Sequence, residues 1–365
     1  MNNGRTREID GLRGWAAVVV VLFHFIEEVF RHVNPILEHP LIGSLLDGRL
    51  PVMIFFILSG DALSSVYFRK YEASSVDRLL VKRYFRLTLP VFVSCVGVYL
   101  LMRLGFVYHR EAAKIVGSEM WLAQFLDIDA SVVRLIKYSF SDVYVGHSRG
   151  KSFNPMLWTM SVEMVGSMLV FLVCYSWQRL RKPVHILAVV SLGLTFLGSM
   201  YGLFLFGVIL AYGRSQGVLD AFRSRKNMNL QTWLALMLLM VVNVALWALN
   251  APASPFMVLS AGIVIVCYLN SSMGAFLSNK FSLYLGDVSF PLYLTHFSVL
   301  VSILSYGIVE TYRDYGGVTL GNAYGWVLGS LVFAFLYAHI FRQVEKWMLK
   351  AVDRVVPVLL VRASD

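Results

Sequence analysis

Long apolar runs separated by short polar segments make up most of this chain. A run of about 20 apolar residues is long enough to cross a bilayer as a helix. Backbone N–H and C=O groups must be paired within the segment when it lies in hydrocarbon, so each run is predicted to be helical. The pattern predicts an all-α fold, a polytopic membrane helix bundle of about ten transmembrane helices. The runs cover residues 14–30, 50–68, 87–107, 157–177, 184–197, 201–212, 232–249, 255–270, 283–305 and 323–341.

The fifth and sixth runs are short, and they form one long helix if Gly198 and Gly202 do not mark a turn between them. Charge separates the two possibilities. With ten spans, 22 of the 32 Lys and Arg residues fall in segments assigned to the cytoplasmic side, as the positive-inside rule requires. With one merged helix, the basic residues of 214–226 and of the tail move to the outer side. The charge pattern therefore favours ten spans with both termini cytoplasmic.

Composition excludes a soluble domain. Hydrophobic residues make up 58% of the chain and charged residues only 15%, which is well outside the soluble range. The net charge of +10 is explained by the cytoplasmic segments, so no nucleic-acid partner is expected. Cys95, Cys174 and Cys267 lie singly in predicted spans without the spacing of metal ligands. They are interpreted as packing residues, and no metal site is expected.

We expect residues 1–365 to form one membrane domain. Two segments outside the spans have amphipathic character. The outer segment 110–155 contains WLAQFL and VVRLIKY, and the tail 342–365 alternates apolar residues with Lys346, Lys350 and Arg354 at helical spacing. Helices of this kind lie on membrane surfaces, so the tail is predicted to be an interfacial helix on the cytoplasmic face. A plain structural helix is the alternative for both segments.

A few ionisable residues lie well inside the predicted spans, where each is costly unless it faces a partner or water. The informative ones are His24, Glu27, Glu28, Asp61, Glu163 and His296. Arg13 stands at the cytoplasmic entrance of the helix that carries His24. Eleven residues separate the two, or about three turns and about 16 Å, so they share one face of that helix.

His24 and Glu163 lie at a similar depth, each about six residues below the outer end of its span, so the two side chains are expected to approach each other. Glu27 and Glu28, three and four residues after His24, are alternative carboxylates that hold the imidazole in one tautomer. Asp61 and His296 fall nearer the midplane and receive no assigned role. The structural alternative, hydrogen bonds that tie helices together, stays open for all of these residues.

Five sequence strings occur in a defined order along the chain. They are REIDGLRGWAAVVVVLFHF at the first span, FFILSG in the second, an Arg-x-x-Arg at Arg83 and Arg86 before LTLP, LWTMSVE in the fourth and LGDVSFPLYLTHF in the ninth. Together they resemble the acyltransferase 3 family of membrane acyltransferases, whose signature of Arg, ten residues and His fits Arg13 and His24. Two positions depart from the family's pattern, since Met164 replaces a second acid and Asp61 replaces an apolar residue.

The resemblance implies an O-acyltransferase in the inner membrane of a bacterium. Such an enzyme moves an acyl group, typically acetyl, from cytoplasmic acyl-CoA to a hydroxyl of a cell-surface or exported glycan. The expected partners are acyl-CoA, with acetyl-CoA as the first candidate, a carbohydrate or glycolipid acceptor, and the lipid bilayer. The identity of the acceptor and the length of the acyl chain stay open.

Each candidate site residue has a chemical role in this reaction. A histidine of near-neutral pKa is well suited to take the proton of a weakly nucleophilic hydroxyl, so His24 is the candidate base. Glu163, or a carboxylate of the first span, orients it, and an acyl-His intermediate is an alternative to direct transfer. Arg83 and Arg86, with Lys82 beside them, are the candidate phosphate ligands of the donor, and Arg13 guides its entry.

Two other function classes fit the buried charges less well. A secondary transporter or flippase would use His24, Asp61 and Glu163 as a proton relay and would make no bond. Transporters often have paired halves with interrupted helices at matching positions, and the sequence shows no such pairing. A membrane scaffold or sensor would have no need of the buried charges.

Overall fold

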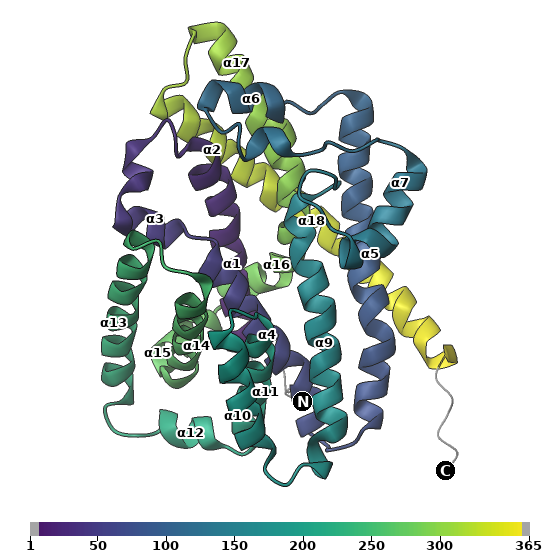
Figure 1. Ribbon diagram of the computed structural model, residues 1–365, viewed down its shortest axis with the longest axis vertical. Coiled ribbons are helices and arrows are strands. Elements are labelled where there is room, and N and C mark those ends of the chain that lie inside the picture. The colour runs from purple at the N-terminus through teal and green to yellow at the C-terminus, as the bar shows by residue number, and fades with distance from the viewer. Residues whose placement is uncertain (1–6, 360–365) are drawn as a thin grey trace.

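The computed structural model describes residues 7–359, and these residues form helices joined by loops, with no strand among them (Figure 1). In the labels used here, η marks 3-10 and π-helices. The elements are α1 (Arg7–Leu22), η1 (Phe23–Glu27), α2 (Glu28–Phe30), η2 (Pro35–Glu38), α3 (Pro40–Leu46), α4 (Arg49–Phe68), α5 (Ser74–Leu104), α6 (His109–Val116), η3 (Leu122–Gln124), α7 (Val132–Lys137), η4 (Tyr138–Asp142), α8 (Val143–Val145), η5 (Pro155–Trp158), α9 (Thr159–Ser176), η6 (Trp177–Arg179), α10 (Pro183–Phe196), α11 (Tyr201–Ser215), α12 (Val218–Arg223), α13 (Met228–Ala248), α14 (Ala253–Leu269), α15 (Ser271–Leu277), α16 (Lys280–Val299), η7 (Leu300–Leu304), α17 (Ser305–Tyr315) and α18 (Leu320–Leu359).

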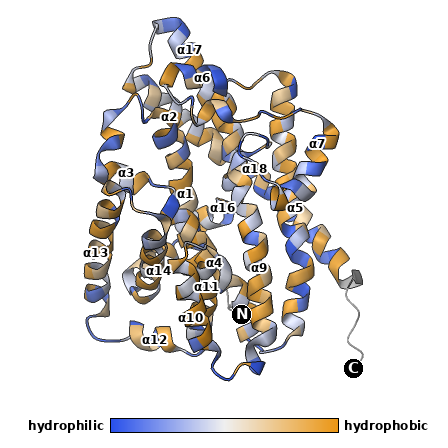
Figure 2. Ribbon diagram, in the orientation of Figure 1, coloured by the Kyte–Doolittle hydropathy of each residue, from blue (hydrophilic) through white to orange (hydrophobic). Residues whose placement is uncertain are grey.

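The expectation of a helical membrane bundle is confirmed. Among the described residues, seven helical segments are long and apolar enough to cross a membrane, an eighth is the pair α14 and α15 bent by 92°, and α10 and α11 are shorter apolar helices. Each of the ten predicted runs overlaps one of these segments, with ends that agree to within a few residues except where the helix is longer than the run. The number of membrane spans stays a prediction, because only seven helical segments meet the requirements of length and composition by themselves. Figure 2 shows hydrophobic residues along the helix bodies and hydrophilic residues gathered toward the two ends of the molecule.

The fifth and sixth runs are two helices, so the merged alternative is wrong. The chain turns between α10 and α11 at Gly198, whose φ of +74° is the left-handed conformation that glycine adopts without strain. The two helices then pack against each other, and the hydroxyl of Ser191 on α10 donates to the carbonyl of Gly202 on α11 at 2.7 Å.

Two helix pairs approach each other through glycine and form the centre of the bundle. A Cβ placed on Gly14 of α1 would lie 2.4 Å from the backbone nitrogen of Gly286 on α16. A Cβ placed on Gly207 of α11 would lie 2.2 Å from the carbonyl oxygen of Ile57 on α4. Only glycine permits such contact between backbones. These four helices surround the site described below.

The two ends of the bundle are held by different polar contacts. At the basal end, where α12 lies (Figure 1), Arg223 pairs with Glu8 at 2.8 Å and Lys82 pairs with Asp353 at 2.5 Å. Segments predicted to share the cytoplasmic side therefore meet at one end. Which end faces the cytoplasm stays a prediction.

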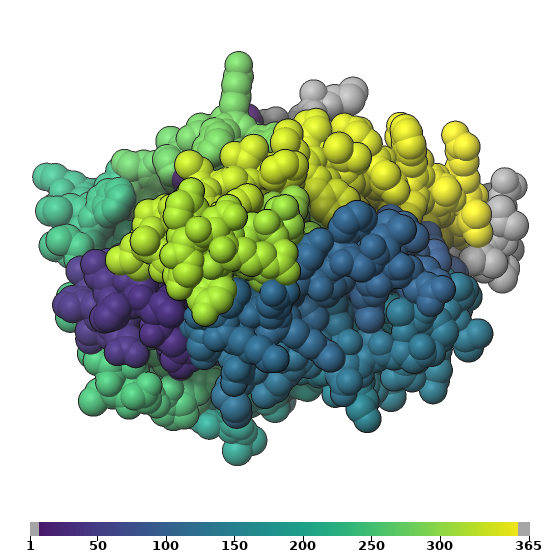
Figure 3. Space-filling view, turned by 90° about the horizontal axis from the view of Figure 1, so that it is seen from above, coloured from purple at the N-terminus to yellow at the C-terminus, as the bar shows by residue number. Residues whose placement is uncertain are grey.

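The opposite end, here called the cap end, carries α6, α7 and α17, and Figure 3 views it from above with these helices covering it. Asn34 donates to the hydroxyl of Tyr324 at 2.7 Å, and the hydroxyl of Ser118 donates to the carbonyl of Glu28 at 3.0 Å. These contacts join residues of predicted outer segments, Asn34 and Ser118, to residues at the predicted outer ends of the first and tenth spans.

The predicted tail helix is present, but it is not a separate element. α18 runs without a break from Leu320 to Leu359, so the tenth apolar run and the first part of the tail form one helix. The sequence contains no Gly or Pro from position 330 to position 356, and so nothing interrupts helical hydrogen bonding there. Residues 360–365 of the predicted tail lie outside the described residues. Its placement at the membrane surface stays a prediction.

Candidate active site

A cavity of about 630 Å³ lies among α1, α4, α5, α9, α11, α16 and α18, within the size range of small-molecule and cofactor sites. The lining toward the basal end is rich in cations: Arg13, Arg69, Arg83, Arg86, Arg214 and Lys346. The lining farther into the bundle is apolar and aromatic, with Val20, Phe55 and Tyr293. The cavity therefore combines a cationic part toward the basal end with an apolar part deeper in the bundle.

The structure brings together four of the five predicted site residues. Arg13 of α1, Arg83 and Arg86 of α5 and Glu163 of α9 all line this cavity, although 150 positions of sequence separate the first from the last. Acidic groups also line it, so the guanidinium groups are not alone there; Arg13 lies 4.0 Å from Asp10. His24 is the one predicted site residue that is not part of the lining.

Glu163 does not contact His24, and the predicted meeting of the two is wrong. Within the described residues, the carboxylate of Glu163 accepts a hydrogen bond from Ser59 and forms an ion pair with Arg83. Arg83 also donates through Nε to the hydroxyl of Ser167 at 2.7 Å. Similar depth along two helices does not place two side chains on facing sides. Glu163 instead faces α4 and α5 and holds the Arg83 guanidinium in the cavity wall.

His24 lies against a second histidine. It sits in η1, a π-helical turn between α1 and α2, and such turns are frequent at functional sites. Its ring stacks on that of His296 with centroids 5.3 Å apart and on that of Trp121 at 5.7 Å. In the described part of the chain, Nδ1 of His24 is buried without a hydrogen-bond partner.

His296 is held in one tautomer by its own helix. Its Nδ1 lies 3.1 Å from the carbonyl oxygen of Leu292, which only accepts, so this contact requires the proton on Nδ1. The other ring nitrogen, Nε2, then has a free lone pair, and it is buried with no partner among residues 7–359. No role for His296 is predicted from the sequence, where its place in the LYLTHF string is the available signal.

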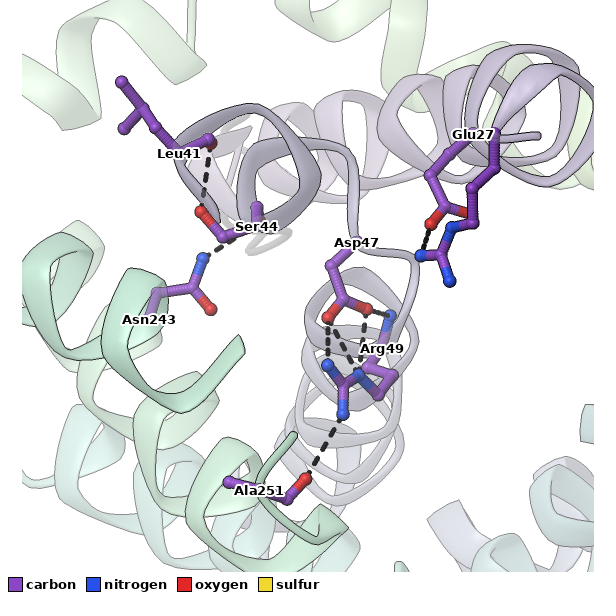
Figure 4. A network of polar contacts seen from close by, with 8 residues as sticks. Glu27, Leu41, Ser44, Asp47, Arg49, Asn243 and Ala251 are labelled. Carbon is purple, nitrogen blue, oxygen red and sulfur yellow. Dashed lines mark hydrogen bonds and ion pairs between the residues drawn. The ribbon is translucent and has the colours of Figure 1, made fainter. Parts of the chain in front are cut away.

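Glu27, one of the two carboxylates that follow His24, is engaged elsewhere. Glu27 forms an ion pair with Arg31, one turn along the same helix (Figure 4). In the same view Asp47 binds Arg49, whose guanidinium also donates to the carbonyl of Ala251 at 3.4 Å. Neither contact orients an imidazole. Asp47 and Arg49 instead anchor the start of α4 beside the loop that precedes α14.

One helical turn separates the cavity from His24. Val20 lines the inner part of the cavity, and His24 follows four residues later on the same helix, a rise of about 6 Å. On α16, Tyr293 lines the cavity and its ring lies 6.1 Å from that of His296. The phenol of Tyr293 is fixed by Thr159 at 2.6 Å. Tyr293 and His296 thus connect the inner end of the cavity with His24.

The cap positions Trp121 over His24. Trp121 packs edge-on against Phe125 with centroids 4.8 Å apart, and the carbonyl of Phe125 is bound by Nε2 of His109 on α6 at 2.9 Å. Burial lowers the pKa of His109 to about 4, which keeps this ring neutral at physiological pH. Burial also lowers the pKa of His147 in the cap loop. A neutral, hydrogen-bonded His109 therefore holds the segment that covers His24.

Other sequence expectations can be compared with the structure. Cys95, Cys174 and Cys267 are buried free thiols in the bundle, as expected of packing residues. The part of the chain that the structure describes contains no group of three or more His, Cys, Asp or Glu residues suited to hold a metal ion.

Comparison with known proteins identifies the family. The acyltransferase 3 family model, described as an acyltransferase domain, matches residues 6–342. The O-acetyltransferase PaAT-1 of Phomopsis amygdali is 23% identical in a match that covers 94% of this chain and 84% of that protein. No solved structure gives a significant match. Since the family match covers nearly the whole chain, including His24, Glu163 and the Arg-x-x-Arg pair, this chain belongs to the acyltransferase 3 family and is a multi-pass membrane acyltransferase.

Proposed function

We propose that this enzyme is an O-acyltransferase that moves an acetyl group from acetyl-CoA to a hydroxyl of a cell-surface or exported glycan. The observation that carries the proposal is the cation-rich cavity whose inner end stops one helical turn from His24. The donor is anionic at its nucleotide end and uncharged at its thioester end, and the two parts of the cavity match these two chemistries. PaAT-1, an O-acetyltransferase, is the relative that supports an oxygen acceptor.

The donor binds with its phosphates toward the basal end. Arg13 and Arg86 supply guanidinium groups that bind phosphate oxygens with charge-assisted hydrogen bonds. Arg83 contributes its charge there, while its ion pair with Glu163 fixes its direction. The acyl end lies beside Val20, Phe55 and Tyr293. In this orientation the thioester points at the His24 and His296 pair.

His24 acts as the general base. The acceptor oxygen attacks the thioester carbonyl carbon, and His24 takes the hydroxyl proton as the new C–O bond forms. The C–S bond then breaks, and the proton passes to the departing sulfur, so CoA leaves as the free thiol. In the alternative sequence, a ring nitrogen of His24 attacks the thioester carbonyl carbon and the C–S bond breaks, so that CoA leaves as a thiolate. The hydroxyl then attacks the acyl-His24 carbonyl carbon, the C–N bond breaks, and the hydroxyl proton ends on the CoA sulfur.

The partner of His24 in this proposal is His296 rather than a carboxylate. Among the described residues, no hydrogen bond or ion pair joins His24 to a carboxylate. The aromatic rings beside His24 are those of His296, Trp121 and Phe23. The lone pair on Nε2 of His296 is the nearby basic group that the tautomer leaves available. Glu163 takes a different role from the one expected, since it orients the donor-binding Arg83.

The acceptor approaches from the cap end. A sugar ring packs well on an aromatic face, and Trp121 lies on His24 in the cap. With the basal end cytoplasmic, the donor enters from the compartment that makes acyl-CoA and the product leaves on the outer side. The inner membrane of a bacterium, expected from the sequence, fits this direction of transfer.

The test is thiol release by the purified protein. With acetyl-CoA and a membrane glycan extract as acceptor source, the wild type is expected to release free CoA thiol, and His24→Gln is expected to release it at the background rate. A proton-coupled transporter or flippase makes no bond and would release no thiol from acetyl-CoA. Binding of CoA without thiol release, under conditions that support transport of a glycan, would reject the enzymatic proposal.

A further inference from the structure

Asp61 is the most deeply buried carboxylate beside the donor cavity, and the reaction proposed above gives it no role. Its side chain has no exposed surface. It forms an ion pair with Arg214 of α11, and its second oxygen accepts a hydrogen bond from the phenol of Tyr268 on α14 at 2.7 Å. The Arg214 guanidinium also lies 5.9 Å from the centre of the Tyr268 ring. Three helices thus contribute one polar cluster.

The glycine contact between α4 and α11 creates this cluster. Gly207 lies against α4, and a Cβ on it would lie 2.7 Å from the backbone nitrogen of Asp61. Arg214 follows Gly207 by seven residues, or about two turns, and therefore lies on the same face of α11. The helices approach closely at Gly207, and the ion pair forms where that face continues toward the basal end.

Arg214 is the member of the cluster that reaches the cavity. Its side chain is 20% exposed and forms part of the cavity lining, together with Arg13 and Arg86. α4 packs against both α5 and α11, so Arg86 and Arg214 come to the cavity from two different helices that contact α4. Asp61 and Tyr268 lie behind Arg214 and do not line the cavity.

A buried ion pair is a poor device for stability, because desolvation offsets much of the attraction between the charges. Its clear effect is to fix the direction of the Arg214 guanidinium. A guanidinium is a rigid planar fork, so the contact of Nη2 with Asp61 fixes the direction in which the Arg214 side chain points. Tyr268 in turn fixes the carboxylate. The arrangement holds a cation at one position in the wall of an anion-binding cavity.

We propose that Arg214 binds a phosphate group of the acyl donor, and that Asp61 and Tyr268 are positioning residues that aim its guanidinium into the cavity. The inference rests on the proposed use of acyl-CoA and adds a second phosphate-binding wall, formed by α11, to the one formed by α5.

The experiment compares two donors that share the acetyl thioester and the pantetheine arm but differ in the nucleotide part and its phosphates. Acetyl-CoA carries the nucleotide phosphates, and acetyl-pantetheine lacks them. Loss of one charge-assisted hydrogen bond costs about tenfold or more in binding, so Arg214→Gln is expected to raise KM for acetyl-CoA by about that factor and to raise KM for acetyl-pantetheine much less. Arg214→Lys is expected to fall between the wild type and Arg214→Gln, because ammonium keeps the charge but not the fork.

The roles of the positioning residues Asp61 and Tyr268 are tested separately, by the KM for acetyl-CoA of variants at each position. Asp61→Asn and Tyr268→Phe keep the shape of each side chain, and both are expected to raise KM for acetyl-CoA by a smaller factor while kcat changes little. Arg225 is exposed at the same end of the molecule and does not line the cavity, so Arg225→Gln is the matched control and is expected to behave like the wild type. Thermal unfolding in detergent checks that each variant is folded.

The outcomes separate this inference from the proposed function. No thiol release by the wild type with either donor would reject the proposed function. Normal turnover with acetyl-CoA, together with an equal change in KM for both donors in Arg214→Gln, would reject only the phosphate contact. If Asp61→Asn does not fold, then Tyr268→Phe and Arg214→Lys still decide the matter, and a KM unchanged in both would overturn the proposal.

Discussion

At the scale of single residues, the site is built from pairs of side chains in direct contact. Glu163 holds Arg83, His296 lies against His24, and Asp61 holds Arg214. In each pair, one side chain is proposed to contact a substrate and the other contacts that side chain. Substitutions at the two members of a pair are therefore expected to change the same kinetic constant, and the change is expected to be larger at the member that acts on the substrates.

The His24 and His296 pair gives the first prediction. His24→Gln is expected to lower kcat by about 10²–10⁴-fold, the usual contribution of a general base, while CoA binding is retained. His296→Gln keeps a side-chain donor for the Leu292 carbonyl, so it is expected to lower kcat by a smaller factor. Single-turnover kinetics with labelled acetyl-CoA measure both. Near-normal turnover in His24→Gln would leave His24 as a packing residue.

The second prediction concerns Glu163. Glu163→Gln removes the charge that holds Arg83, whose Nε remains bound to Ser167, so the variant is expected to raise KM for acetyl-CoA and to keep most of its kcat. Glu119→Gln, at an exposed position in the cap, is the control. If Glu163→Gln lost as much kcat as His24→Gln with unchanged KM, Glu163 would belong with the base rather than with the donor site.

The sequence predicts the depth of a side chain along its helix axis well, but it does not predict the direction in which the side chain points about that axis. Depth follows from residue count at about 1.5 Å per residue, and the count correctly put Arg13, Arg83 and Arg86 near one end of the bundle. Rotation of a helix about its axis is set by packing against neighbours, which a single sequence does not reveal. His24 and Glu163 were therefore paired by depth although they face different helices.

At the scale of elements, close glycine contacts position the polar groups. Gly207→Ala is expected to force α4 and α11 apart, because the added Cβ would meet backbone atoms that have no alternative position. The expected cost is about 1–3 kcal/mol of stability, with a raised KM for acetyl-CoA since Asp61 and Arg214 separate.

Gly213 on the same helix provides the control for this prediction. A Cβ on Gly213 has nothing within 4 Å, so Gly213→Ala is expected to be neutral or to stabilise the helix by about 0.5–1 kcal/mol. Thermal unfolding in detergent compares the two variants. Equal stability of Gly207→Ala and Gly213→Ala would mean that the helices tolerate a wider spacing.

The cap is expected to loosen in acid. The pKa of His109 is about 4 in the folded protein and about 6.5 when the ring is exposed. The opened cap therefore binds the proton more tightly than the closed cap, and closure weakens as pH falls from about 6.5 to 4. Hydrogen exchange of residues 109–127 measures this change. His109→Gln keeps a donor for Phe125 but does not titrate, so its cap should show little pH dependence; equal pH dependence would assign the effect to another group.

At the scale of the whole molecule, the direction of transfer depends on topology. The segments predicted to be cytoplasmic meet at the basal end, beside the cationic part of the cavity. A reporter fused after the tail or inserted at 69–73 is expected to read as cytoplasmic, and one inserted at 146–152 is expected to read as external. An external reading for the tail would reverse the molecule and place the donor cavity on the wrong side for acyl-CoA.

The sequence predicted the bundle well because hydrophobic run length and basic residues constrain helices in a bilayer strongly. It resolved α10 and α11 as two helices from charge alone. It did not predict that α18 is continuous, since amphipathic spacing in the tail fits both a separate helix and an extension. It also gave no role to Asp61 and His296, whose partners Arg214 and His24 lie in distant parts of the chain.

The central claim is acyl transfer from acyl-CoA to a hydroxyl with His24 as base, and transfer of label in native membranes tests it most directly. Membranes from cells that express the wild type or His24→Gln contain the natural acceptor and are incubated with acetyl-CoA labelled in the acetyl group. The account predicts base-labile label in the glycan fraction of wild-type membranes and background label with His24→Gln. Equal label in the two preparations, at matched protein levels, would contradict it.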